Sequence, residues 1–321
     1  MTGHCIFTAP YEFLPEELIL AYTDTLPTIF CEINERSELL KDEEAYAWIV
    51  NPGQAFRVDS ESLGMLPSIK VVVTPSTGTN HIDLEECEER GVTVYSLLDN
   101  RECLDTISAS AEFTFLLLMA VLRRFGIAIT EVSGGRWREN EDRMRGRELS
   151  DLRVGLVGFG RIGRRMFRYC SSFGAEVVCH DPYVMDTEVP NLSLEEIFKT
   201  SDVVCVCCAL TAETSGLIGR SLLESLKQEA SLINTSRGEV IVETDLAEVL
   251  ALRPDLRVGL DVLTGEITGT QWKSPLLPFK DQGQVLVTPH IAGATLDSQT
   301  KAARCALHIL RNHMGLPYRE I

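Results

Sequence analysis

The sequence predicts an α/β protein with two doubly wound domains, each built around a parallel sheet. Three observations lead to this prediction. The chain has 321 residues, which is enough for two domains with separate cores. Short apolar runs alternate with helical stretches along its length, a pattern typical of parallel sheets covered by helices. A glycine-rich turn joins one of these runs to a helix near the middle of the chain.

The first hundred residues contain apolar runs that predict strands. These runs lie at 5–8, 47–50, 69–74 and 92–95. An acidic helix is predicted over 84–90, because Gly91 after it suits a helix C-cap. A long helix with apolar residues at helical spacing is predicted over 101–124.

A second block of alternating strands and helices begins near residue 152. Its strands are predicted at 154–157, 176–180, 203–208, 231–234, 257–260 and 284–288, and a final helix at 296–314. The segment 134–148, which precedes this block, is dense in arginine. Acidic residues are interleaved with these arginines, which favours a solvated connection or a subunit contact over a nucleic-acid surface.

The charge balance restricts the possible partners. The chain has 30 Lys and Arg against 47 Asp and Glu, a net charge of −17. Nucleic acids and anionic membranes bind positive surfaces, so we expect neither as a partner. The longest uninterrupted apolar stretch, 113–122, is shorter than the ~20 residues that span a bilayer. The first ten residues lack the pattern of a secretory signal, and we therefore expect a cytoplasmic protein.

The ten cysteines predict reduced, buried thiols, because they are scattered through apolar segments of a long chain. Cys205 and Cys208 have the spacing of a redox or zinc half-site. On the predicted strand, however, residues three apart point to opposite faces of the sheet. His308 and His313 are five apart on a predicted helix and do not share a face. We expect no metal site.

The glycine-rich turn reads Gly158-Phe-Gly160-Arg161-Ile162-Gly163 and lies between an apolar run and a helix. In this context the pattern predicts a dinucleotide site. Gly158 would permit the tight turn, Gly160 would let backbone N–H groups approach a pyrophosphate, and Gly163 would bring helix and strand close together. Arg161 and Ile162 lie in the same turn.

Asp181 ends the next predicted strand, 23 residues after Gly158. A carboxylate at this point would bind the ribose hydroxyls of the adenosine, and its charge would repel a 2′-phosphate. NAD is therefore the expected cofactor rather than NADP. The alternative is a glycine-rich turn of another α/β protein, for instance a methyltransferase.

Polar residues also follow three later predicted strands, at the sheet edge where open α/β proteins bind ligands. Thr235, Ser236 and Arg237 follow the strand at 231–234. Asp261 and Glu266 follow the strand at 257–260, and His290 follows the last strand.

With these residues, the sequence resembles the D-isomer-specific 2-hydroxyacid dehydrogenases over nearly its whole length. The resemblance rests on the fingerprint glycines and three further motifs in the family's order and rough spacing. These motifs are Thr77-Gly-Thr-Asn-His-Ile-Asp83, Asn-Thr-Ser-Arg237-Gly and Thr-Pro-His290-Ile-Ala-Gly. The tripeptide Gly78-Thr-Asn is similar to the 3-phosphoglycerate dehydrogenase branch.

The resemblance implies an NAD-dependent oxidoreductase that transfers a hydride between nicotinamide and a small D-2-hydroxy or 2-oxo acid. Its candidate catalytic residues are Arg237, Glu266 and His290. Arg237 would bind the carboxylate and oxo oxygen through its planar fork. His290 would exchange a proton with the oxo oxygen, and Glu266 would orient the imidazole.

The resemblance also implies further contacts and an architecture. Backbone N–H groups at Thr77 and Gly78 would receive the substrate carboxylate, while Asp261 and residues 235–237 would face the nicotinamide half. Residues 1–100 and 291–321 would form a flavodoxin-like substrate domain, and residues 101–290 an inserted NAD-binding Rossmann domain. Members of the family typically form homodimers through their nucleotide-binding domains, so the resemblance also implies a homodimer.

The sequence departs from the family pattern in two places. Glu266 is followed by Ile267 where the family has Pro, and Cys207-Cys208-Ala209 replaces a His-x-Pro motif. We expect altered cofactor affinity rather than lost function. The alternatives are an NAD-sensing corepressor-like interaction protein, a 3-phosphoglycerate dehydrogenase specifically, or a dehydrogenase of an inorganic or one-carbon anion.

Overall fold

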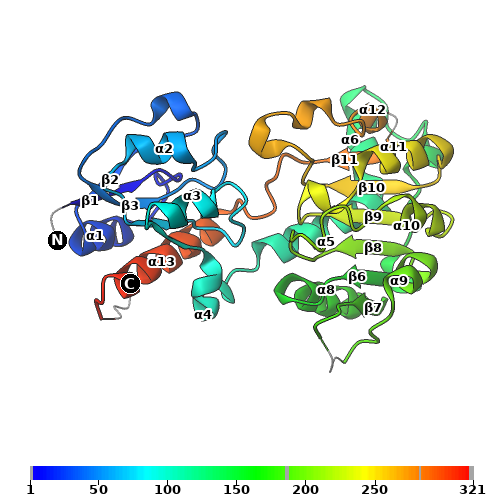
Figure 1. Cartoon of the computed structure of the whole chain (residues 1–321). Coiled ribbons are helices and arrows are strands. Elements are labelled where there is room, and N and C mark those ends of the chain that lie inside the picture. Colours follow the sequence, from blue (N-terminus) through cyan, green and yellow to red (C-terminus); the bar gives the residue numbers. More distant parts are fainter. Residues whose placement is uncertain (1–2, 185–187, 282, 318–321) are drawn as a thin grey trace. The chain divides into compact units, whose positions relative to one another are not determined.

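The computed structural model describes residues 3–184, 188–281 and 283–317, which form two compact units (Figure 1). Unit 1 comprises Met1–Ile107, Ile267–Gly269 and Ala294–Ile321. Unit 2 comprises Ser108–Glu266 and Thr270–Gly293. Each unit contains a parallel sheet with helices on both faces, which confirms the predicted fold class.

Unit 2 has a six-stranded sheet in the part of the chain that the structure describes, with order β11-β10-β9-β8-β6-β7. The strands are β6 (Arg153–Val157), β7 (Glu176–His180), β8 (Val203–Val206), β9 (Ser231–Asn234), β10 (Arg257–Leu260) and β11 (Val285–Val287). All of their pairings are parallel. Asn191 forms a single parallel bridge to Cys179 of β7. This bridge takes the place of the third strand in a Rossmann sheet.

Two layers of helices bury the faces of this sheet. One face packs against α5 (Ala109–Leu122) and α8 (Arg161–Ser172). The other packs against α9 (Leu194–Thr200), α10 (Arg220–Ser225) and α11 (Glu243–Leu252). Cys205 belongs to the first apolar cluster and Cys208 packs against the second, so the two thiols lie on opposite faces. Strand β8 ends at Val206, two residues before the predicted end at 208, so Cys208 lies beyond the strand on which the prediction had placed it.

The long helix predicted over 101–124 is wrong, because the chain forms two helices there. Helix α4 (Arg101–Leu104) ends at Asp105, and α5 begins after Ser108, where the chain passes from unit 1 to unit 2. By length and composition alone, Arg101–Leu122 resembles a membrane span, and 44% of its apolar 18-residue window is buried. The packing of α5 against β9, β10 and α8 accounts for its apolar character.

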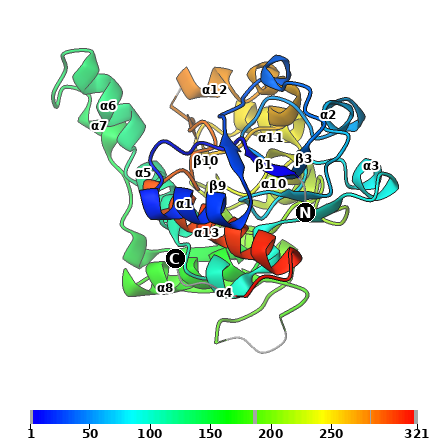
Figure 2. The ribbon, with the colours of Figure 1, turned by 90° about the vertical axis from the view of Figure 1, so that its left-hand side faces the viewer.

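Beyond α5 the chain turns sharply. Arg124 has a φ of 51° and precedes α6 (Phe125–Ser133), which is followed by α7 (Glu141–Met144). Figure 2 shows α6 and α7 extending away from α5. Helix α12 (Pro278–Asp281) precedes β11.

Unit 1 has a five-stranded parallel sheet among the described residues, with order β2-β1-β3-β4-β5. The strands are β1 (His4–Phe7), β2 (Thr28–Phe30), β3 (Ala45–Ile49), β4 (Val71–Val73) and β5 (Thr93–Tyr95). This is the flavodoxin-like order. Strand β2 is not among the predicted strands, because it has three residues and none of them is fully buried.

Helices from both ends of the chain cover unit 1. On one face lie α1 (Glu16–Thr25) and α13 (Leu296–His313), and on the other lie α2 (Ser60–Met65) and α3 (Leu84–Glu89). The Tyr22 hydroxyl on α1 donates a hydrogen bond of 2.6 Å to the Ala303 carbonyl on α13. The last helix is therefore an integral part of a unit built mainly from the first hundred residues.

The prediction of reduced thiols throughout is wrong for one pair. Cys103 on α4 and Cys305 on α13 form a disulfide within unit 1, with their Cα atoms 5.8 Å apart. They are 202 residues apart in sequence, so only the packing of α4 against α13 brings them together. The other eight cysteines are thiols: Cys5, Cys31, Cys87, Cys170, Cys179, Cys205, Cys207 and Cys208.

Candidate active site

The glycine-rich turn lies between β6 and α8, and two of its glycines are required by close backbone contacts. Gly158 has a φ of 97°, and a Cβ there would lie 2.7 Å from the Cys208 nitrogen. A Cβ on Gly163 would lie 2.2 Å from the Gly158 carbonyl oxygen. Larger residues would therefore push α8 and the end of β8 away from the turn.

Gly160 has a different environment, because a Cβ there would meet no atom within 4 Å. It is the N-cap of α8, and no side chain caps the helix. Arg161 and Ile162 begin the first turn, where backbone N–H groups have no acceptor within the helix. An open surface at a helix N-terminus fits a pyrophosphate.

Asp181 follows β7 next to this turn. Its carboxylate accepts hydrogen bonds from the backbone N–H of Phe159 at 2.8 Å and of Tyr183 at 2.9 Å. These bonds hold the carboxylate beside the glycines. Strand β6 has β7 on one side and β8 on the other, so the turn lies at the point where the strand order reverses. Dinucleotides bind at such switch points, and the residues present fit NAD.

Cys207 and Cys208 follow β8 and lie against Gly158, at the position of the missing His-x-Pro motif. Burial raises the pKa of the Cys208 thiol to about 11. Near pH 7 this side chain is therefore neutral and suits an apolar lining rather than a nucleophile.

The turn after β9 is organised by Asn234, which is buried at the end of the strand. Its Oδ1 accepts from the Ser236 N–H at 3.0 Å and hydroxyl at 2.8 Å, and its Nδ2 donates to the Arg237 carbonyl at 2.9 Å. Thr235 is buried and shares a 2.6 Å hydrogen bond with Thr114 of α5. The sequence prediction missed Asn234 as a positioning residue, although a polar residue ending an apolar run is a usable signal.

Arg237 is half-buried, and its Nη1 donates to the Ser236 carbonyl at 2.7 Å. Burial lowers the pKa of the guanidinium from its usual value, while Glu266 and Glu239 oppose that shift. Guanidinium remains charged in proteins. The site therefore holds a partly desolvated cation at the carboxyl end of β9, where a carboxylate ligand would gain a strong interaction.

Asp261 follows β10 and is completely buried. Its carboxylate accepts hydrogen bonds from the Thr288 hydroxyl at 2.6 Å and from the N–H groups of Ile291 at 3.0 Å and Ala292 at 2.8 Å. Asp261 thus fixes the loop that carries His290. The predicted contact between Asp261 and the cofactor stays a prediction.

His290 lies in this loop with a φ of 54°, a left-handed conformation that is uncommon outside glycine. Its N–H donates to the Asp261 carbonyl at 2.7 Å, which holds that conformation. The His290 Nδ1 is 2.5 Å from Glu266 Oε2, and Glu266 Oε1 accepts from the Leu263 N–H at 2.8 Å. Glu266 therefore orients the imidazole so that Nε2 is the nitrogen left for a ligand.

Thr77 and Gly78 belong to unit 1, whereas all the other predicted site residues belong to unit 2. They follow the carboxyl end of β4, where Thr77 is exposed and Gly78 half-buried. The Ser76 hydroxyl donates to the Gly78 carbonyl at 2.8 Å and fixes this turn. In unit 2, the structure brings Glu266, His290 and Asp261 into one hydrogen-bonded group.

Comparison with known proteins identifies the family. The family model described as D-isomer specific 2-hydroxyacid dehydrogenase, NAD binding domain, matches residues 115–292. The chain belongs to this family. This D-2-hydroxyacid dehydrogenase uses NAD and transfers a hydride between hydroxy and oxo acids.

Two curated relatives and one solved structure illustrate the similarity. Glyoxylate reductase of Thermofilum pendens is 32% identical over 298 residues, covering 87% of this dehydrogenase and 83% of the relative. D-3-phosphoglycerate dehydrogenase of Mycobacterium tuberculosis is 30% identical over 295 residues, covering 90% of this chain and 53% of the relative. This chain therefore spans about half of that second relative. D-lactate dehydrogenase from Aquifex aeolicus, complexed with NAD and lactic acid, has a TM-score of 0.77 at 25% identity, covering 97% and 95% of the two chains.

Proposed function

We propose that this dehydrogenase reduces a small, non-phosphorylated 2-oxo acid and oxidises the corresponding D-2-hydroxy acid in the reverse direction. The observation that carries the choice of substrate is the loop 51–56 in unit 1, which contains no charged residue. Of its two buried polar side chains, Asn51 is bonded within the unit through both ends of its amide, and the Gln54 Nε2 donates to the Phe56 carbonyl at 3.1 Å. The proposal agrees with the similarity to a glyoxylate reductase.

NADH, when bound, supplies the hydride. In the proposed reaction, His290 donates its Nε2 proton to the oxo oxygen during reduction and takes a proton from the hydroxyl during oxidation. Glu266, hydrogen-bonded to Nδ1, holds the imidazole in place with Nε2 free for the substrate. Arg237 binds the carboxylate and oxo oxygen with two parallel N–H groups, which orients the reacting carbon.

The contacts of the 51–56 loop support a substrate without phosphate. Asn51 is buried, and its Nδ2 donates to the Ile33 carbonyl at 3.2 Å and to Asn34 Oδ1 at 3.1 Å. Its Oδ1 accepts from the Gly53 N–H at 2.9 Å. A phosphate needs close cationic partners to replace its hydration. The nearest cation along the chain is Arg57, which is exposed.

A steady-state comparison of hydroxypyruvate with 3-phosphohydroxypyruvate tests this proposal. We expect a higher kcat/KM for hydroxypyruvate in NADH oxidation. A clear preference for the phosphorylated acid that disappears in Arg57→Ala, but persists in the charge-matched control Arg90→Ala, would overturn it. Arg90 suits this control because it pairs with Glu86 on α3.

We also propose that unit 1 is the substrate domain, with backbone N–H groups at Thr77 and Gly78 receiving the substrate carboxylate. Unit 2 would hold NAD through Gly158, Gly160, Gly163 and Asp181. Thr77→Pro removes one N–H and should raise KM for the 2-oxo acid without changing NADH affinity. Thr77→Ala keeps the N–H and serves as the control. An unchanged KM in Thr77→Pro would contradict the assignment.

We propose a homodimer formed through unit 2. Phe125, Ile129 and Val132 lie on one side of α6 at helical spacing, and all three are exposed, as is Trp137. An apolar surface of this kind is typical of an interface that a second copy buries. Ile129→Glu should shift the enzyme to monomers in analytical ultracentrifugation. Leu252→Glu, at an exposed apolar residue on α11, is the control. A monomeric wild type would refute the proposal.

We propose a cytoplasmic location, supported by the eight cysteines that remain thiols. Fractionation of cells that express the full chain, with thiols trapped at lysis, tests this location. We expect recovery in the cytosolic fraction, with the eight other cysteines trapped as thiols. Recovery from an oxidising compartment would overturn it.

A further inference from the structure

A pocket in unit 2 lies at the amino-terminal ends of β10 and β11, away from the candidate active site. Arg257 and Val258 from β10 and Val285 and Leu286 from β11 line it. Asp261 follows the carboxyl end of β10, so the pocket and the active site occupy opposite ends of the same strands. The pocket volume of about 180 Å³ is more than ten times the ~10–15 Å³ that one water molecule occupies on this measure.

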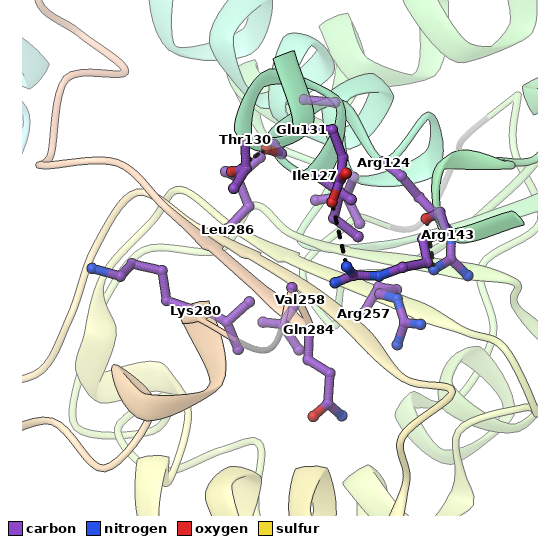
Figure 3. A pocket seen from close by; sticks show the side chains of 15 residues that line it. Arg124, Ile127, Thr130, Glu131, Arg143, Arg257, Val258, Lys280, Gln284 and Leu286 are labelled. Atoms are coloured by element: carbon purple, nitrogen blue, oxygen red, sulfur yellow. Dashed lines mark hydrogen bonds and ion pairs between the residues drawn. The ribbon is translucent and has the colours of Figure 1, made fainter. Parts of the chain in front are cut away.

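Basic side chains gather on one side of this pocket. Figure 3 shows Arg124, Arg143 and Arg257 together there. The acidic lining residue, Glu131, is buried and already bonds Arg136, Asn140 and Arg143. The pocket therefore has an excess of positive charge in a protein whose net charge is −17.

Arg257 and Arg124 bear most of this excess. The Arg257 Nη1 donates to the carbonyls of Pro254 and Leu256, and its Nε is buried without a hydrogen-bond partner among the described residues. Burial and, to a smaller extent, the nearby charge of Arg124 lower the pKa of Arg257, while the carboxylates of Asp255 and Glu229 oppose that shift. Two guanidinium groups repel each other, and a bound anion would remove that repulsion.

Helix α6 adds a second source of positive potential. Its N-cap is Arg124, which makes no side-chain capping bond, and its first residues Gly126 and Ile127 line the pocket. The N–H groups of a first helical turn have no acceptor within the helix and favour an anion. The guanidinium groups and this helix end thus provide donors for one anionic group.

The rest of the pocket lining is mixed, with apolar residues beside the polar residues Thr130, Lys280 and Gln284. The apolar residues include Ile127, Val258 and Leu286. A ligand with a compact anionic head and a short apolar body would satisfy both parts of the pocket. Such walls also strengthen the attraction between the head group and the arginines, because they exclude water.

We propose that this pocket is a second ligand site, which binds a phosphate group, best as the head of a small monoester with an apolar body. The phosphate oxygens accept hydrogen bonds from Arg124 and Arg257, and the apolar body packs on Ile127 and Leu286. Binding here is independent of the substrate and of NAD, because none of these residues belongs to the candidate active site.

Isothermal titration of the full-length enzyme with inorganic phosphate and with phenyl phosphate tests this site. Measurements are made at constant ionic strength, with the enzyme saturated with NAD so that the cofactor site is filled. We expect one phosphate-type ligand per chain, with phenyl phosphate bound more tightly than the free ion. Arg257→Gln and Arg124→Gln should each weaken binding about tenfold, the effect of losing one charge-assisted hydrogen bond.

Arg220→Gln is the matched control, because Arg220 lies on α10 in the same unit and pairs with Glu224 and Glu248. It removes the same charge and should leave phosphate affinity unchanged. Circular dichroism and thermal melting verify that each variant is folded, and Arg124→Gln remains informative should Arg257→Gln fail to fold.

Three outcomes would overturn the proposal. Equal phosphate affinity in the wild type and in Arg257→Gln would show that the pocket does not bind the ligand. Loss of binding in Arg237→Lys would assign the anion to the active site instead. A change from dimer to monomer in Arg257→Gln, with no phosphate binding by the wild type, would show that a side chain of a second copy fills the pocket.

Discussion

The two units differ in how they are assembled from segments of the chain. Unit 2 is built from nearly one continuous stretch of chain and contains Arg237, Glu266 and His290. Unit 1 is assembled from both ends of the chain, with α13 packed on a sheet formed by the first hundred residues. A disulfide between α4 and α13 links its two parts covalently.

Because of this difference, we expect substitutions in unit 2 to affect catalysis and substitutions in unit 1 to affect stability. The polar side chains at the strand ends of unit 2 are held by short hydrogen bonds within the unit, such as those of Asp261 and Asn234. Exchanging a reactive side chain there should reduce turnover and leave the fold intact. In unit 1, the corresponding weak point is the connection between distant segments, so changes there should reduce stability first.

The largest expected effect is that of His290→Ala in unit 2. General acid–base catalysis contributes about 10²–10⁴ in rate, so turnover should fall by that factor while NADH affinity is retained. Stopped-flow titration with NADH and steady-state assays measure the two quantities. Lost NADH binding with preserved turnover at saturation would refute the role of His290.

Arg237→Lys should retain the fold and lose most activity, because a point charge replaces a planar fork. We expect a fall in kcat/KM of about 10- to 100-fold, the effect of one or two charge-assisted hydrogen bonds. Steady-state kinetics and thermal melting provide the comparison. Turnover like that of the wild type at an unchanged Tm would count against Arg237 as the carboxylate-binding residue.

Unit 1 is tested by Cys103→Ser and Cys305→Ser. A disulfide typically stabilises a protein by about 2–4 kcal/mol, so each variant should melt earlier than the oxidised wild type. With a reductant present, wild type and variants should melt within about a degree of each other, a difference expected of a conservative change. Cys31→Ser, at a half-buried thiol, is the control. Equal melting under oxidising conditions would show that the bond does not contribute to stability.

Asp181→Ser tests the cofactor end of unit 2. The carboxylate opposes a 2′-phosphate, so the wild type should prefer NADH over NADPH, and the variant should narrow that preference. Values of kcat/KM for both cofactors measure it. Equal wild-type efficiency with NADH and NADPH would contradict the assignment.

The smallest expected effects are changes in the pH dependence of stability, and they should be similar in both units. In unit 1, hydrogen bonds from Arg36 are the main cause that holds the pKa of Asp59 well below its usual value. Arg253 does the same for Asp255 in unit 2. A carboxyl group with a lowered pKa stabilises the folded state above its unfolded pKa of about 3.9, and this contribution is lost as the pH falls further.

Asp59→Asn should therefore reduce stability at pH 7 by about 1 kcal/mol, partly because it weakens the N-cap of α2. On acidification, the melting temperature of this variant should fall less than that of the wild type. Asp255→Asn should show the same pH dependence in unit 2. Melting temperatures between pH 3 and pH 7 measure both. A larger fall in melting temperature at low pH in either variant than in the wild type would contradict this prediction.

Much of unit 2 could be predicted because its strands and its glycine-rich turn are encoded by short, local sequence patterns. The bounds of β7, β9 and β10 agree with the predicted strands, since buried parallel strands are continuous apolar runs. The glycine turn was recognisable because a tight turn, an open helix end and a close helix contact each require glycine at a fixed spacing. The short strand β2, with no fully buried residue, gave no such signal.

By itself, the sequence determined the alternating α/β pattern, the nucleotide turn and the polar residues at the strand ends, because each depends on neighbours within a few residues. Only the tertiary structure decided which distant groups meet. The Cys103–Cys305 bond, the break before α5 and the hydrogen bonds from residues 288–292 to Asp261 all depend on segments far apart in the chain. Such contacts form because folding buries apolar faces together, and no local pattern records which faces will pair.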